Sequence, residues 1–305
     1  QQRAIFHPDT TKSDEVITLG TANMIVLSRK DTVTDGDGNT ASSSTSNDIS
    51  LAFQFKDHGP SITVTKVADA DALEVDETNL PATKSAEFAD NFSSVPNYGA
   101  DGAGEIKSAY TFDVKSSGVD SGLTDVATKQ AVLLTVTNDG KAVEGHISSI
   151  SDPVFTVTVD KITGQVILDQ SRALVHPDKT NHDDSVSLAD GMITLKRTDT
   201  IIDGDGDKGT GEASLDISKT LIFKDDGPSI TVTAGVVDPG TLTVDESNLA
   251  TNASSKTVDF SGKFSSDPTK TSYGADGPGE IKSAYTLDVQ TSGVSSGLID
   301  VATKQ

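Results

Sequence analysis

The chain has 305 residues, 46 acidic and 24 basic, for a formal net charge of −22, and it contains neither Cys nor Trp. This acidic excess excludes nucleic-acid binding, which needs clustered Lys and Arg against phosphate, and it argues equally against anionic membrane surfaces. Without Cys, neither disulfides nor thiolate metal sites hold the fold together, and no apolar run approaches the ~20 residues of a membrane-spanning helix.

Long segments of the sequence occur twice. GPSITVT at 59–65 returns at 227–233, 168 positions later, and RAIFHPD at 3–9 is matched by RALVHPD at 172–178. This offset is far longer than the roughly 20–50 residues of solenoid units, so each repeat is expected to contain whole domains.

Strand signals follow one another along the chain, through SITVT, AVLLTVT, VFTVTVD and MITLKRT. Each alternates apolar with polar residues, and Gly, Asp, Asn and Pro punctuate the intervals. The pattern predicts an all-β chain, a tandem array of antiparallel β-sandwich domains of immunoglobulin-like or cadherin-like type. We expect the C-terminal part of one repeat at 1–59, one complete repeat with two β-sandwich subdomains at 60–227, and the N-terminal part of a third at 228–305.

Two loops alternate Asp with Gly at equivalent places in the two copies, DGDGN at 35–39 and DGDGD at 203–207. Glycine lets the backbone turn tightly enough for carboxylates to converge on one ion, and calcium takes roughly six to eight oxygen ligands. A type I′ hairpin turn, which favours Asp-Gly, is the alternative. The predicted calcium ligands are Asp35, Asp37, Asn39, Asp203, Asp205 and Asp207.

Further carboxylates recur near the boundaries between repeats. DHGP and DDGP mark these boundaries, and the acidic pairs of LEVDE and LTVDE follow fewer than twenty residues later. A boundary carboxylate and the acidic pair of the next domain can hold ions between domains; the alternative is a strand edge kept soluble by charge. The candidate ligands are Asp57, Asp225 and Asp226 at the boundaries and Asp76, Glu77, Asp245 and Glu246 in the acidic pairs.

Two other motifs that contain polar residues, YGADG and HPD, occur in both copies. The YGADG loops contribute Asp101 and Asp276, for which a metal ligand and a plain turn are both open. The HPD motifs of His7 and His176 are interpreted as structural turns in which Pro stops a strand, because no second His falls at a ligand spacing. His182 is not repeated in the other copy and is given no role.

The sequence carries no catalytic motif such as a nucleophile elbow, a zinc-protease helix or a phosphate-binding loop. Ten Phe, four Tyr and no Trp also leave few platforms for the sugar of a glycoside hydrolase. We therefore expect no enzyme. The alternative function is a calcium-dependent glycan-binding β-sandwich module, for which Tyr98 and Tyr273 beside the two GADG segments are the candidate aromatics.

Taken in order, LxVDE, YGADGxGEI, SGLxDxAT, VFTVTVDxxTG, HPD, DGDGD and FxDDGPSI resemble the tandem repeats of giant RTX adhesins, which bacteria export by type I secretion. The resemblance spans nearly the whole chain and departs from the pattern at DHGP, where His58 stands in place of Asp226. It implies β-sandwich extender domains rigidified by calcium at the acidic pairs, the Asp-Gly loops and the Asp-Gly-Pro junctions named above.

The expected function is a non-catalytic, calcium-dependent extender segment of an extracellular bacterial surface adhesin, which projects an adhesive region away from the cell for attachment or biofilm formation. Its partners are neighbouring repeats of the same chain, with the host or surface ligand bound elsewhere in the full protein. We expect on the order of 4–10 calcium ions over the chain, with Kd of ~10⁻⁴–10⁻³ M, so that the sites fill only outside the cell.

Overall fold

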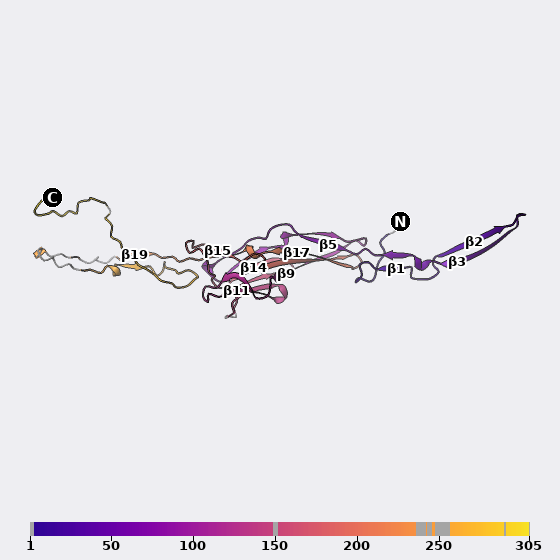
Figure 1. The fold of residues 1–305 in the computed structure, drawn as a ribbon, viewed down its shortest axis with the longest axis horizontal. Coiled ribbons are helices and arrows are strands. Elements are labelled where there is room, and N and C mark those ends of the chain that lie inside the picture. Colours follow the sequence, from indigo (N-terminus) through magenta and orange to yellow (C-terminus); the bar gives the residue numbers. More distant parts are fainter. Residues whose placement is uncertain are drawn as a thin grey trace.

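The computed structural model describes residues 3–148, 152–235, 242, 246–247, 257–289 and 291–304. This part of the chain contains strands and short 3₁₀ turns but no α-helix, so the all-β prediction is confirmed. Within the same residues, no helix has the length and apolarity needed to cross a bilayer. Figure 1 shows the strands strung along one axis, with β2 (Val26–Thr34) and β3 (Thr40–Asp48) at one end and β19 (Val232–Ala234) toward the other.

The first unit forms two small antiparallel pairs. β1 (Val16–Thr18) pairs with β4 (Gln54–Lys56), which follows the 3₁₀ turn η1 (Ser50–Ala52). β2 pairs with β3 along their whole length, and every residue of this hairpin is exposed.

The complete repeat contains a six-stranded antiparallel sheet in the order β10-β11-β12-β13-β14-β7. Along β13 and β14 every second residue is buried, which is the period expected when one face of a strand packs on the core. The six strands are β7 (Ala82–Glu87), β10 (Val119–Thr124), β11 (Ala131–Thr137), β12 (Ala142–His146), β13 (Phe155–Val159) and β14 (Gln165–Gln170).

Three smaller sheets complete the repeat, in the orders β17-β16-β9, β15-β18-β6 and β5-β8. β6 and β18 are parallel, whereas the other pairs in the described residues are antiparallel. The strands are β5 (Ser61–Lys66), β6 (Leu73–Asp76), β8 (Phe92–Asn97), β9 (Ala103–Val114), β15 (Ser185–Ser187), β16 (Ile193–Asp203), β17 (Lys208–Asp216) and β18 (Leu221–Lys224). The 3₁₀ turns are η2 (Glu77–Asn79), η3 (Ala89–Asn91), η4 (Asn138–Gly140) and η5 (Ser218–Thr220).

A single cluster of buried side chains, running in sequence from Val64 to Phe223, forms the core of this repeat. It is mostly Val, Leu and Ile, with Phe155 and Phe223 in contact at 5.1 Å between ring centroids. Full burial of such side chains contributes about 1.5–3 kcal/mol each, so the core is the main source of stability. The pairing of sheets into sandwiches and the division into two subdomains stay predictions.

The last unit has one short pair among its described residues, β19 with β20 (Phe264–Ser266), which follows η7 (Ser261–Lys263). Residues 278–289 are the counterparts of β9 but form no strand, and apolar side chains such as Leu287 are exposed there. Nearly the same sequence thus pairs with β16 and buries Tyr110 and Phe112 in one copy, and it is exposed in the next.

Candidate metal sites at the repeat junctions

The loop between β16 and β17 carries the second Asp-Gly motif. Oδ1 of Asp203 accepts the backbone N–H groups of Gly206 at 3.1 Å and Asp207 at 2.8 Å, which closes the turn. Gly206 has a φ of +105°, in the region that favours glycine. The other oxygen of Asp203, Oδ2, is buried without a hydrogen-bond partner. The turn therefore uses half of this carboxylate and leaves the other half for a ligand.

The YGADG loop between β8 and β9 lies directly against this turn. The N–H of Gly204 donates to the carbonyl of Gly102 at 3.1 Å, and a Cβ at position 204 would overlap the Asp101 carbonyl. This close approach brings carboxylate oxygens of Asp101, Asp203 and Asp205 within 4.8 Å of one another. We call these three residues the oxygen group. Its donors are all carboxylate oxygens, which calcium prefers.

Burial and mutual repulsion raise the pKa values around the oxygen group. Burial, followed by the adjacent Asp205 carboxyl group, raises the pKa of both Asp101 and Asp203. Asp207, only 1% exposed, has two unpartnered carboxylate oxygens, and burial followed by the adjacent Asp57 carboxyl group raises its pKa to about 6. At neutral pH the ionised carboxylates repel one another, and a divalent cation among them would relieve that repulsion.

Two buried carboxylates elsewhere in the repeat, Asp125 and Asp199, are paired with arginine. Asp199 is fully buried and accepts bonds from Arg197 Nε at 2.8 Å and Nη2 at 3.0 Å. Asp125, 1% exposed, accepts two bonds from Arg172 at the same distances. Burial raises the pKa of each of these carboxyls, but the arginine bonds outweigh it and the net shift is downward. The oxygen group contains no such base, and a cation from outside the chain would compensate its charge.

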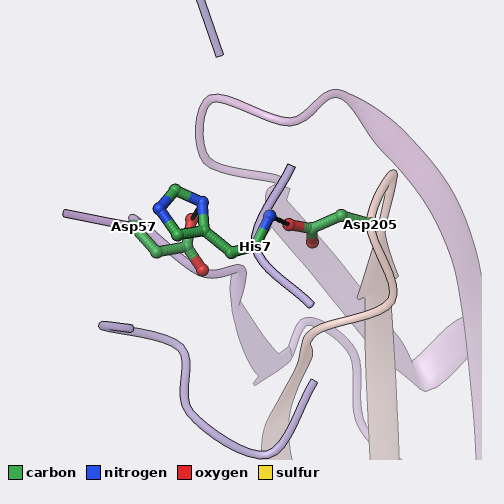
Figure 2. Close-up of side chains that lie close together, drawn as sticks. All are labelled: His7, Asp57 and Asp205. Atoms are coloured by element: carbon green, nitrogen blue, oxygen red, sulfur yellow. Dashed lines mark hydrogen bonds and ion pairs between the residues drawn. The ribbon is translucent and has the colours of Figure 1, made fainter. Parts of the chain in front are cut away.

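A second group, His7, Asp57 and Asp205, joins the first unit to the complete repeat. In Figure 2 the His7 ring faces Asp57, with Nδ1 and Oδ1 3.5 Å apart, while Asp205 accepts the backbone N–H of His7 at 3.3 Å. His7 is 4% and Asp57 7% exposed. Burial lowers the pKa of His7, but the Phe55 carbonyl and the Asp57 charge raise it by more, so the net shift is upward.

The third group, Glu77, His176 and Asp225, lies at the opposite end of the complete repeat. The parallel register of β6 and β18 pairs Asp76 with Lys224, so the next residues, Glu77 and Asp225, leave the two strands side by side. The sequence suggested that the boundary residue Asp57 and the following acidic pair, which includes Glu77, hold an ion together. The structure instead groups Glu77 with Asp225, at the next boundary. Asp225 is the counterpart of Asp57 one repeat later.

Only one of the two carboxylate oxygens of Glu77 accepts hydrogen bonds. Its Oε1 accepts the side-chain N–H of Gln170 at 2.7 Å and the backbone N–H of Leu174 at 2.9 Å, and it lies 3.6 Å from Nε2 of His176. Oε2 of Glu77, both ring nitrogens of His176 and Oδ1 of Asp225 have no hydrogen-bond partner. Burial raises the pKa of Asp225, with further increases from Asp276 and Glu77 against the lowering effect of His176.

Other predicted ligands lie outside the three groups. In the exposed β2–β3 turn, Asp35 Oδ1 accepts the Asn39 backbone N–H at 2.7 Å and Asp37 accepts the Asn39 side chain at 2.8 Å. These bonds close a hairpin turn in which Gly38 alone has a positive φ, so it is not the type I′ turn of the alternative interpretation. Asp76 accepts the Thr78 N–H at 2.8 Å at the start of η2. Asp226, Glu246 and the exposed Asp276 join no group of three among the described residues, and Asp245 lies outside those residues.

Both histidines in these groups were assigned to structural turns by the sequence reasoning. The repetition itself contains the signal that would have found them. His7 precedes Asp57 by 50 residues and His176 precedes Asp225 by 49, so the same histidine–aspartate pair recurs at nearly the same spacing.

Comparison with known proteins gives one family. The sequence model of a family described as "Domain of unknown function (DUF5801)" matches residues 72–218 and 241–305. The first match extends from the start of β6 to η5, and the second lies in the third unit, so the family unit recurs with the internal repeat. No curated protein matches the chain.

Proposed function

The chain belongs to the DUF5801 family, and we propose that it is a non-catalytic, calcium-dependent extender segment of a bacterial cell-surface adhesin. In this proposal the segment lies outside the cell, after type I secretion, and projects an adhesive region away from the surface. Its direct partners are the neighbouring repeats of the same chain.

The oxygen group is the observation that carries the proposal. Three carboxylates from two loops converge within 4.8 Å, and oxygens on all three are buried without a partner. The buried carboxylates of Asp125 and Asp199 have arginine partners, so the absence of a base within this group favours a site for a divalent cation. Calcium suits it best because all the donors are oxygens and because flexible loops tolerate its variable geometry.

The position of the groups supports a stiffening role. Asp205 of the oxygen group accepts the backbone N–H of His7 from the first unit, so a cation in the oxygen group would brace the contact between the two units. Occupancy by an ion favours the folded, joined state through mass action, by ~2.7 kcal/mol per site at a concentration 100 times Kd. At low cytosolic calcium the like charges stay unrelieved, which favours the loose chain that export requires.

The test compares the chain in millimolar calcium and in EDTA. Calcium should raise the melting temperature by several degrees, and small-angle scattering should show a rod that becomes flexible on chelation. The double variant Asp203→Asn/Asp205→Asn should lose most of this response, whereas the matched control Asp35→Asn/Asp37→Asn, in the exposed copy of the loop, should keep it. Equal melting and equal scattering with and without calcium would refute the proposal.

The alternative of a glycan-binding module gains no support from the aromatics that the sequence singled out. Tyr98 and Tyr273 are both partly buried, so neither presents a fully exposed ring on which a sugar can stack.

A further inference from the structure

The histidine–aspartate pair occupies the same place at two successive junctions. His176 follows His7 by 169 positions and Asp225 follows Asp57 by 168, and both pairs lie in a group of potential ligands. Three of the four side chains are buried, with His7 4%, Asp57 7% and His176 9% exposed, and Asp225 is partly buried. Both junctions therefore place an imidazole beside carboxylates.

The hydrogen bonding of His7 leaves two acceptors facing each other. Its Nε2 lies 3.4 Å from the Phe55 carbonyl, a contact that requires the proton on Nε2. In the neutral ring Nδ1 is then a lone pair, and it points at the Asp57 carboxylate 3.5 Å away without a hydrogen bond. A buried lone pair against a buried carboxylate is unfavourable unless a proton or a metal ion lies between them.

At the second junction the unsatisfied atoms are more numerous. Neither ring nitrogen of His176 has a partner, although the side chain is more than nine-tenths buried, and Glu77, 2% exposed, has its Oε2 free. Oδ1 of Asp225 is the fourth unpartnered atom of the group. These three side chains therefore offer one nitrogen and two oxygen donors around a common point.

The two groups also complement each other. The first includes Asp205, from the loop of the following repeat, and the second includes Glu77, from the same repeat as its histidine. The counterpart of Glu77 one repeat earlier and that of Asp205 one repeat later fall outside the sequence. By repeat position, the two groups together name one imidazole and three carboxylates as ligand positions.

We propose that the histidine-containing group at each junction binds a transition-metal ion of the Zn²⁺ class, with the imidazole as its nitrogen ligand. Calcium and magnesium take oxygen ligands, whereas Zn²⁺ takes imidazole nitrogen together with Asp or Glu oxygen in four-coordinate sites. The oxygen group keeps calcium, and Asp205, which belongs to both groups at the first junction, lies between the two ions. The site thus has a chemical class different from that of the calcium sites and stands apart from the proposed function.

The experiment measures zinc binding by the full chain in saturating calcium, by calorimetry and by the visible absorption of Co²⁺ as a substitute ion. About two ions should bind per chain, one at each histidine-containing group. His7→Gln and His176→Gln should each remove one ion, and the double variant should bind none. The exposed His182 provides the matched control, and His182→Gln should bind as the unmodified chain does.

A second variant and a direct probe guard against misfolding. Glu77→Gln keeps an oxygen for the bonds from Gln170 and Leu174 but removes the charge, so it should fold and still weaken zinc binding at the second junction at least tenfold. In ¹⁵N spectra, zinc should shift the ring nitrogens of His7 and His176 and leave His182 unchanged. Absence of zinc binding, unchanged binding in the double variant, or ring nitrogens of protonated imidazolium that ignore zinc would each overturn the inference. Calcium-dependent melting that persists in that case would leave the proposed function intact.

Discussion

Replacing Asp207 with Asn tests whether the loop between β16 and β17 is a cation site or only a turn. The substitution preserves the turn, because Asn39 occupies the equivalent position of the first copy. Without calcium it removes a carboxylate whose pKa is raised from 3.8 to about 6, which corresponds to ~3 kcal/mol at most. Solvent screening around the loop reduces this to about 1–2 kcal/mol. Asp207→Asn should therefore raise the melting temperature in EDTA by about 2–8 °C.

In calcium the same substitution should act in the opposite direction. An ion at 100 times its Kd stabilises the folded state by ~2.7 kcal/mol, and a lost carboxylate removes part of that gain. The melting temperature in saturating calcium should fall by about 3–8 °C. The measurement is calorimetric unfolding at pH 7.5 in EDTA and in calcium, with Asp37→Asn in the exposed hairpin as the control. A loss of stability of equal size in both conditions would show that Asp207 serves the turn, and it would refute the reasoning.

Three other expectations rest on separate contacts. In EDTA, the stability contributed by neutral Asp207 is fully present below pH ~3.8 and is lost as pH rises through about 6. Thermal melts between pH 5 and 7.5 should therefore show falling stability in EDTA, whereas in calcium the trend should flatten or reverse. Arg197→Met should leave Asp199 buried and unpaired and cost about 3–5 kcal/mol with or without calcium, as denaturant titration would measure, and equal stability would contradict the role given to this pair. The exposed β2–β3 hairpin of one chain should pair with residues 278–289 of another, since the equivalent segments β16 and β9 pair in the complete repeat. Light scattering should show concentration-dependent oligomers, which deletion of residues 24–48 should abolish. A monomer at all concentrations would be the contrary result.

Much of the fold was predictable because its signals are local. The period of two in VFTVTVD appears directly in the alternating burial of β13, and the Gly and Asp residues predicted as punctuation lie in turns. The Asp-Gly loop at 203–207 was predicted as a ligand loop, and the structure brings Asp203 and Asp205 together with Asp101. Local sequence was sufficient for these because the turn and its carboxylates lie within a few residues of one another.

The grouping of ligands was not predictable, because it depends on contacts between distant strands. Glu77 meets Asp225 only because β6 and β18 are parallel and in register, and nothing in LEVDE specifies that partner. The two Asp-Gly loops also differ in their surroundings because of distant contacts, although their first four residues are identical. The second is buried against the Asp101 loop, and the first has no such neighbour among the described residues.

The most direct measurement is a crystal structure of the chain grown in millimolar calcium, with anomalous scattering recorded to locate the ions. The account predicts a calcium peak at ~2.3–2.6 Å from carboxylate oxygens of Asp101, Asp203 and Asp205. Well-ordered loops with only water among those three carboxylates would contradict it.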